Sequence, residues 1–127
     1  MANGLSIGDT FLLSTPPNDM HLFVVIAPTQ NGNHLCVNVT TQRNNSDTSC
    51  VLQSGDHPFI NHDSVINYKQ AREINPATIQ NLIDNGNCYR RDPASADVLN
   101  RIQQGGINST RLKKKLKKAL RKYLNNP

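Results

Sequence analysis

The chain has 127 residues, of which 36% are hydrophobic and only 5% aromatic, and its formal net charge is +5. This length suits one small domain with its own core. No apolar run approaches the roughly 20 residues that span a bilayer, and the first residues lack the basic flank and apolar stretch of a signal peptide, so we expect a cytoplasmic protein with no membrane partner. The three cysteines have no CxxC spacing, which favours free thiols over a disulfide framework.

Strands separated by polar turns are predicted for the first two thirds of the chain. The run His21–Ala27 is apolar and rich in β-branched residues, as in a central strand. The dipeptide Asn31-Gly32 predicts a hairpin turn after it. The five expected strands span Thr10–Leu13, His21–Ala27, His34–Thr41, Ser49–Gln53 and Ser64–Lys69. Five short strands of this kind can close into a small β-barrel, which we expect over residues 1–74.

Helical spacing replaces the strand pattern after residue 74. Asn75-Pro76 predicts a capped helix that stops at Gly86, and Asp92-Pro93 predicts a second helix that ends at Gly105-Gly106. A third, amphipathic helix is expected from Ser109 onward. The predicted architecture is therefore an α+β domain, in which the barrel is followed by a helical extension over residues 75–127.

The positive charge is concentrated in the third helix. Residues 109–127 hold eight of the fourteen basic residues and none of the nine acidic ones, so the six bases and nine acids before them give a net charge of −3. Such a segment is typical of contact with nucleic acid, an anionic membrane surface or an acidic protein. The candidate nucleic-acid-binding residues are Arg111, Lys113, Lys114, Lys117, Lys118 and Arg121.

Two interpretations of this helix stay open at the level of sequence. Leu112, Leu116 and Leu120 recur on one stripe, so they can dock on the body of the protein while the lysines are solvated. Alternatively the helix awaits a partner. Spacing and propensity are the same in both cases.

The segment from Gly55 to Tyr68 is the densest chemical patch. It contains the neighbouring pairs Asp56-His57 and His62-Asp63. A carboxylate beside an imidazole can orient the ring, so the pairs are candidates for acid–base chemistry. The alternative is a turn whose histidines only hydrogen-bond to the backbone. A metal site with Cys50 would have the spacing C-x6-H-x4-H, which matches no strong zinc signature, so we expect no metal and no cofactor.

In the order of these pieces, residues Gly8 to Ile74 resemble the PemK/MazF-like toxins of bacterial toxin–antitoxin systems. The resemblance uses Gly8-Asp9 before a strand, the apolar Val24-Val25-Ile26, the alternating strand that ends at Thr41, and a strand region with Asp63 and Ile66. It implies a small SH3-like barrel that acts as a ribosome-independent RNA endonuclease. It also implies RNA and an antitoxin protein as partners, and a homodimer as one arrangement.

The resemblance assigns roles to only some positions. The family's strand-end threonine falls at Thr40 or Thr41, and its acid falls at Asp63, with His62 beside it. The family's arginine-proline pair is replaced by Met20-His21-Leu22, so His21 would supply the positive group.

Metal-independent RNA cleavage needs a base, an acid and groups that stabilise the charged phosphate. We therefore expect His62, His57 and His21 to transfer protons, Asp63 to orient an imidazole, and Thr40 to donate to a phosphate oxygen. Two other functions stay open: a non-catalytic module that binds nucleic acid or protein, and an adaptor whose basic helix engages an acidic protein or a membrane.

Overall fold

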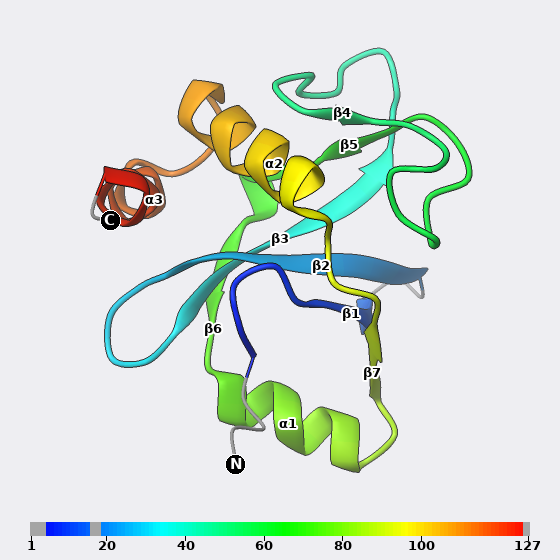
Figure 1. Cartoon of the computed structure of the whole chain (residues 1–127), viewed down its shortest axis with the longest axis vertical. Coiled ribbons are helices and arrows are strands. Elements are labelled where there is room, and N and C mark those ends of the chain that lie inside the picture. The colour runs from blue at the N-terminus through cyan, green and yellow to red at the C-terminus, as the bar shows by residue number, and fades with distance from the viewer. Residues whose placement is uncertain (1–4, 16–18, 126–127) are drawn as a thin grey trace.

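Seven strands and three helices make up the computed structural model, which describes residues 5–15 and 19–125 (Figure 1). The strands are β1 Thr10–Thr15, β2 Asp19–Pro28, β3 His34–Thr41, β4 Val51–Leu52, β5 Ser64–Ile66, β6 Arg72–Ile74 and β7 Cys88–Arg91. The helices are α1 Pro76–Asp84, α2 Ala96–Asn108 and α3 Lys114–Asn125, and a short 3-10 turn, η1, spans Tyr68–Gln70.

All strand pairs are antiparallel, and the order across the sheet is β4-β5-β3-β2-β1-β7. One edge of β3 pairs with β2, while the other edge is shared between β6, at His34–Cys36, and β5, at Val39–Thr41. The α+β class is confirmed. The sheet, however, has seven strands instead of about five, and within the described residues its two end strands do not pair to close a barrel. With two residues, β4 offers few backbone groups for such a closure.

Both faces of the sheet are covered, because alternate side chains of β2 point to opposite sides. Phe23 and Val25 pack in one cluster with Ile79 of α1, and Leu22 and Val24 belong to a larger cluster under α2 and α3. Figure 1 shows α1 on one side of the sheet and α2 on the other. The prediction of a central strand at His21–Ala27 is confirmed.

The predicted turn at Asn31-Gly32 and the predicted helix cap at Asn75 are both confirmed. Asn31 and Gly32 adopt φ values of 60° and 79°, the left-handed conformation that a tight hairpin between β2 and β3 requires. The side chain of Asn75 accepts a hydrogen bond of 2.8 Å from the backbone N–H of Ala77 and caps α1. Each pattern depends only on neighbours in the sequence.

The segment 75–127 is not purely helical, which corrects the expected division at residue 74. Strand β7 lies within it and pairs with β1, with Arg90 opposite Phe11. The sequence Cys-Tyr-Arg-Arg hid this strand, because only Cys88 is buried while the other three residues are exposed at the edge of the sheet.

The expected limits of the second helix were wrong at both ends. Ser95 caps α2 through its side chain, in place of Asp92-Pro93. Gly105 and Gly106 lie inside the helix instead of ending it. A Cβ atom at Gly105 would lie 2.4 Å from the Tyr68 hydroxyl and 2.7 Å from Cys50 Cβ, so glycine lets α2 approach the sheet closely.

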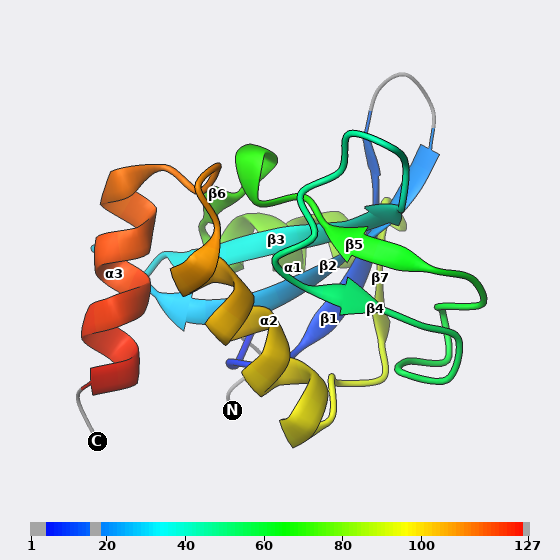
Figure 2. The ribbon, with the colours of Figure 1, turned by 90° about the horizontal axis from the view of Figure 1, so that it is seen from above.

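The third helix begins later than predicted, at Lys114, and it is docked. Ser109 ends α2. Leu112, Leu116 and Leu120 are 4%, 6% and 0% exposed, so the leucine stripe is part of the core. Figure 2 shows α3 lying beside the end of β2 and β3 where the hairpin turns. This settles the docking interpretation and leaves most of the cations facing solvent.

Candidate functional site

A polar cleft of about 300 Å³ lies where β2 begins and β3 ends. The antiparallel register explains the position. Phe23 pairs with Asn38, so His21, two residues before Phe23, and Thr40, two residues after Asn38, lie at the same end of the strand pair. The loop before β5 adds a third wall. The polar side chains around the cleft belong to His21, Thr40, Thr41, Arg43, His62 and Ser64.

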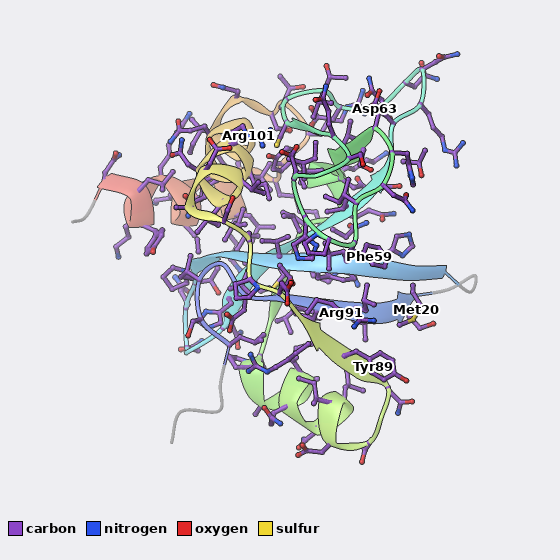
Figure 3. All side chains as sticks on the ribbon, turned by 45° about the vertical axis from the view of Figure 1, so that its right-hand side comes forward. Met20, Phe59, Asp63, Tyr89, Arg91 and Arg101 are labelled. Carbon is purple, nitrogen blue, oxygen red and sulfur yellow. The ribbon has the colours of Figure 1, made fainter. Side chains whose placement is uncertain are left out.

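An apolar rim accompanies these polar groups. Met20 and Phe59 also line the cleft and are 39% and 42% exposed. In Figure 3 both lie near this end of β2, while Asp63 is drawn apart from them among the loops. The structure thus brings together three of the five predicted catalytic residues, His21, Thr40 and His62, and does not place His57 or Asp63 on the cleft.

His62 is exposed and held by two hydrogen bonds. Its Nδ1 lies 2.7 Å from Asn61 Oδ1, and its Nε2 lies 3.0 Å from Thr41 Oγ1. A carboxamide oxygen only accepts, so Nδ1 carries the proton of the neutral ring. Nε2 then accepts a hydrogen bond from the Thr41 hydroxyl and is the basic atom that faces the cleft.

Asn61, and not Asp63, therefore orients the imidazole. Asp63 is exposed, and its backbone carbonyl accepts a hydrogen bond of 3.2 Å from the Gln42 N–H. Within the described part of the chain its carboxylate makes no hydrogen bond or ion pair with His62. The pair predicted from adjacency in sequence is not formed, because the His62 ring is turned towards its other neighbour, Asn61, and towards Thr41.

Arg43 is a site residue that the sequence analysis missed. It lines the cleft two residues after β3 ends, and its backbone is held in a turn by Ser46, whose Oγ accepts from the Arg43 N–H at 2.8 Å. None of the described residues forms an ion pair with its guanidinium. It brings a guanidinium to the cleft, where the sequence had offered only His21 for the positive charge. The available signal was its place as the first base after the strand-end threonines.

His57 is a structural residue. It is 5% exposed, its Nδ1 accepts from the Phe59 N–H at 3.0 Å, and its Nε2 donates to the Asp92 carbonyl at 2.6 Å. With both ring nitrogens engaged by backbone, it fastens the loop before β5 to the segment after β7. These are the backbone hydrogen bonds that the alternative interpretation expects of this histidine.

The neighbouring Asp56 is also structural. Its carboxylate pairs with Arg101 of α2 at 2.7 Å, and the hydrogen bond from this guanidinium holds the pKa of the Asp56 carboxyl below its ordinary value. The same guanidinium contacts Asp97 at 3.2 Å. The loop is therefore tied to α2 as well as to β7.

The thiols do not join this site. Cys36, Cys50 and Cys88 are free and buried, and burial raises the pKa of Cys50 to about 11. Among the residues described here, no group of three or more His, Cys, Asp or Glu side chains is placed to hold a metal ion.

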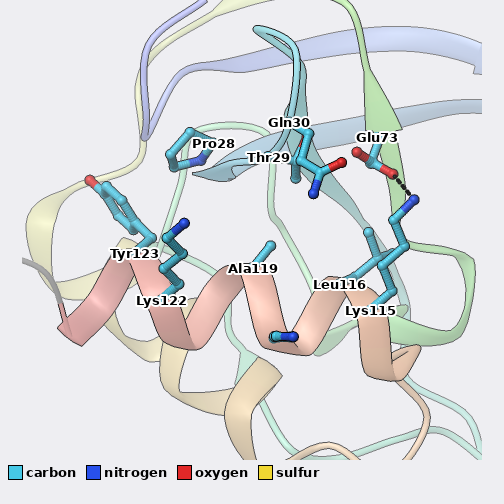
Figure 4. A pocket seen from close by; sticks show the side chains of 10 residues that line it. Pro28, Thr29, Gln30, Glu73, Lys115, Leu116, Ala119, Lys122 and Tyr123 are labelled. Atoms are coloured by element: carbon cyan, nitrogen blue, oxygen red, sulfur yellow. Dashed lines mark ion pairs between the residues drawn. The ribbon is translucent and has the colours of Figure 1, made fainter.

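A larger pocket, of about 550 Å³, lies at the opposite end of β2, between α3 and the β2–β3 turn (Figure 4). Lys115, Lys118 and Lys122 line it above an apolar floor, and Lys115 pairs with Glu73 at 3.3 Å. It has charge but no histidine. The smaller cleft, which combines imidazoles with a guanidinium, is the better candidate for chemistry.

The candidate nucleic-acid-binding residues have different environments. Lys113, Lys114, Lys118 and Arg121 are exposed on or beside α3. Lys117 is half-buried and donates to the Ser109 carbonyl. Arg111 donates to the Asn45 carbonyl at 2.9 Å and so lies against the loop after β3.

Comparison with known proteins returns no matching family model, no matching curated protein and no matching solved structure. Among the described residues, none of the helices has the length and apolar character to cross a membrane.

Proposed function

We propose that the protein is an endoribonuclease that cleaves single-stranded RNA without a metal ion. The observation that carries this proposal is the convergence of His21 and His62, from β2 and the loop before β5, on one cleft with Arg43 and Thr40. Two imidazoles can act as base and acid in the same reaction, and a guanidinium can stabilise the charge on the phosphate.

The reaction follows from the role of each group. Nε2 of His62 takes the proton of a ribose 2′-hydroxyl, whose oxygen attacks the adjacent phosphorus. As that bond forms, the bond from phosphorus to the 5′-oxygen breaks, and protonated His21 gives its proton to the leaving oxygen. Arg43 and the Thr40 hydroxyl donate to the phosphate oxygens. The products are a 2′,3′-cyclic phosphate and a 5′-hydroxyl.

The rim of the cleft supports an unpaired strand as substrate. The exposed ring of Phe59 and the side chain of Met20 provide an apolar surface for a base. Bases of single-stranded RNA stack on aromatic side chains, whereas bases inside a duplex are not accessible in this way.

The test is incubation of the purified protein with mixed-sequence single-stranded RNA in EDTA. We expect cleavage to cyclic phosphates, with a loss of about a hundredfold in His21→Ala and in His62→Ala. Arg43→Gln should lose a similar factor, while the matched variant Arg91→Gln, which changes an exposed arginine of β7, should keep the wild-type rate. Intact RNA after incubation with the wild type would refute the proposal.

A non-catalytic RNA-binding module is the second candidate. The observation that favours it is the docked α3, which together with the preceding Lys113 presents Lys114, Lys118 and Arg121 on a fixed surface that does not depend on catalysis in the cleft. Retention of intact RNA in a binding assay would select this candidate. An SH3-like and toxin-like relationship, an antitoxin partner, a homodimer and a cytoplasmic location stay predictions of the sequence.

A further inference from the structure

A second polar groove, of about 470 Å³, shares a wall with the cleft. Thr40 and Arg43 line both. The remaining lining of the groove includes the carboxamides of Asn44, Asn45 and Asn67, and Arg111 stands beside them. The two hollows therefore meet at a hydroxyl and a guanidinium, which are the groups that the proposed reaction uses on the phosphate.

The loop that forms this groove is fixed by its own contacts. The Asp47 carboxylate accepts hydrogen bonds from the Ser49 N–H at 2.9 Å, the Ser49 hydroxyl at 2.6 Å and the Ser109 hydroxyl at 2.6 Å. Burial raises the pKa of the Asp47 carboxyl, but these hydrogen bonds outweigh burial and hold it below its ordinary value. The groove is therefore preformed, which lowers the cost of ordering it around a ligand.

We propose that this groove binds the nucleotide on the far side of the scissile phosphate from the cleft. The phosphate then lies on Arg43 and Thr40 at the shared wall, one flanking nucleotide occupies the cleft, and the other occupies the groove. Carboxamides carry both a donor and an acceptor, so they can hydrogen-bond the edge of an unpaired base. This inference rests on the proposed function and assigns its second subsite.

Arg111 lies where an RNA strand would leave the groove. It lies at the groove and precedes the exposed cations of α3 in the chain. An RNA strand that leaves the groove meets Arg111 with its next phosphate and then enters the positive field of the basic segment. The groove thus connects the cleft with the lysines, which otherwise lie near opposite ends of β2.

The test is NMR mapping on the intact protein with a dinucleotide whose 2′-hydroxyls are methylated, so that cleavage is blocked. We expect shifts both at His21 and His62 of the cleft and at Asn44, Asn45 and Asn67 of the groove. Asn44→Ala should weaken binding of this dinucleotide about tenfold. The matched variant Asn81→Ala, on the exposed surface of α1, should bind as the wild type does.

The outcomes separate the two proposals. Shifts confined to the cleft, with wild-type affinity in Asn44→Ala, would overturn the second subsite and leave the proposed function standing. Shifts confined to the groove would support a nucleotide site there but contradict catalysis in the cleft. If RNA is cleaved while the dinucleotide moves neither set of resonances, the subsite is overturned and the endoribonuclease is retained.

Discussion

The two ends of β2 differ in what holds them and in what they can do. At the Pro28 end, α3 is anchored by buried leucines and surrounded by lysines, but the cavity there has no imidazole. At the Met20 end, the cleft has two histidines and Arg43, and its walls are β2, β3 and the loop before β5, which is fastened by hydrogen bonds. The difference teaches that the densest charge in the sequence marks a docked helix, whereas the cleft proposed for chemistry brings together residues from three separate segments, β2, the end of β3 and the loop before β5.

This comparison implies that the two ends should respond differently to substitution. Substitutions in the core under α2 and α3 should lower the stability of the protein and should have no specific effect on turnover. Changes at the cleft should alter turnover with little effect on stability, because exposed polar residues contribute few buried contacts.

The largest effect is expected at the α2 packing contact. Gly105→Ala should lower the free energy of unfolding by about 3 kcal/mol, because the new Cβ would lie 2.4 Å from the Tyr68 hydroxyl and 2.9 Å from the Ser49 carbonyl oxygen. Helix propensity alone predicts a gain of about 1 kcal/mol. Urea unfolding measures the difference, with the exposed Gln104→Ala as the matched control. A stabilised Gly105→Ala would show that α2 does not pack as described.

The next effect concerns the cations of α3. Replacement of Lys113, Lys114, Lys118 and Lys122 by Gln removes exposed charge without touching the leucine stripe. Binding of a long single-stranded RNA should weaken, and the slope of log K against log salt should fall by up to about 3, since each contact contributes roughly 0.7. The melting temperature should stay near that of the wild type. Unchanged RNA affinity in the folded variant would remove α3 from RNA binding.

A smaller effect separates the two neighbours of His62. Asn61→Ala should lower kcat about tenfold and leave KM nearly unchanged, because the His62 ring loses the partner that fixes its tautomer. Asp63→Asn should change kcat less than about twofold. The pH profile of kcat should shift in the first variant and not in the second. A large loss of kcat in Asp63→Asn with little change in Asn61→Ala would show that the Asp63 carboxylate, and not Asn61, assists His62.

The smallest effect tests how the wall of the cleft is attached to α2. The pKa of Asp56 is lowered by Arg101, so the ion pair adds stability above the unfolded-state pKa of about 4 and loses it as pH falls through the lower folded-state pKa. Both partners are partly exposed, so Asp56→Asn should cost on the order of 1 kcal/mol at neutral pH. Urea unfolding at pH 7 and about pH 3 should show this gap narrowing in acid. A gap that stays constant would contradict the pairing.

The sequence predicted what depends on local spacing. The strand from His21, the Asn31-Gly32 turn and the helix after Asn75 follow from patterns within a few residues, and they hold. The interpretation of Gly105-Gly106 failed because both glycines are required by close packing against residues that are not their sequence neighbours: Gly105 lies against Tyr68 and Cys50, and Gly106 against Leu120 and Tyr68. Strand β7 was missed because an exposed edge strand has little apolar alternation.

The same limit applied to the candidate site. Thr40 and His21 were named from the resemblance to the toxin family, and His62 from its place beside Asp63; the register of β2 and β3 explains why the first two line one cleft. Arg43 was missed, since a single arginine in a polar loop has no pattern. His57 was included for its neighbour Asp56, and Asp63 for the family's acid at that position and its neighbour His62, whereas side-chain direction decides which groups share a cleft.

The pH dependence of kcat/KM for single-stranded RNA in EDTA tests the central claim most directly. With His62 as base and His21 as acid, rates measured from about pH 5 to pH 8 should follow a bell-shaped profile, in which the base gives the acidic limb and the acid gives the basic limb. The residual activity of His62→Ala should lack the acidic limb, and that of His21→Ala should lack the basic limb. A wild-type profile in either variant, or an RNA that stays intact across this range, would contradict the account.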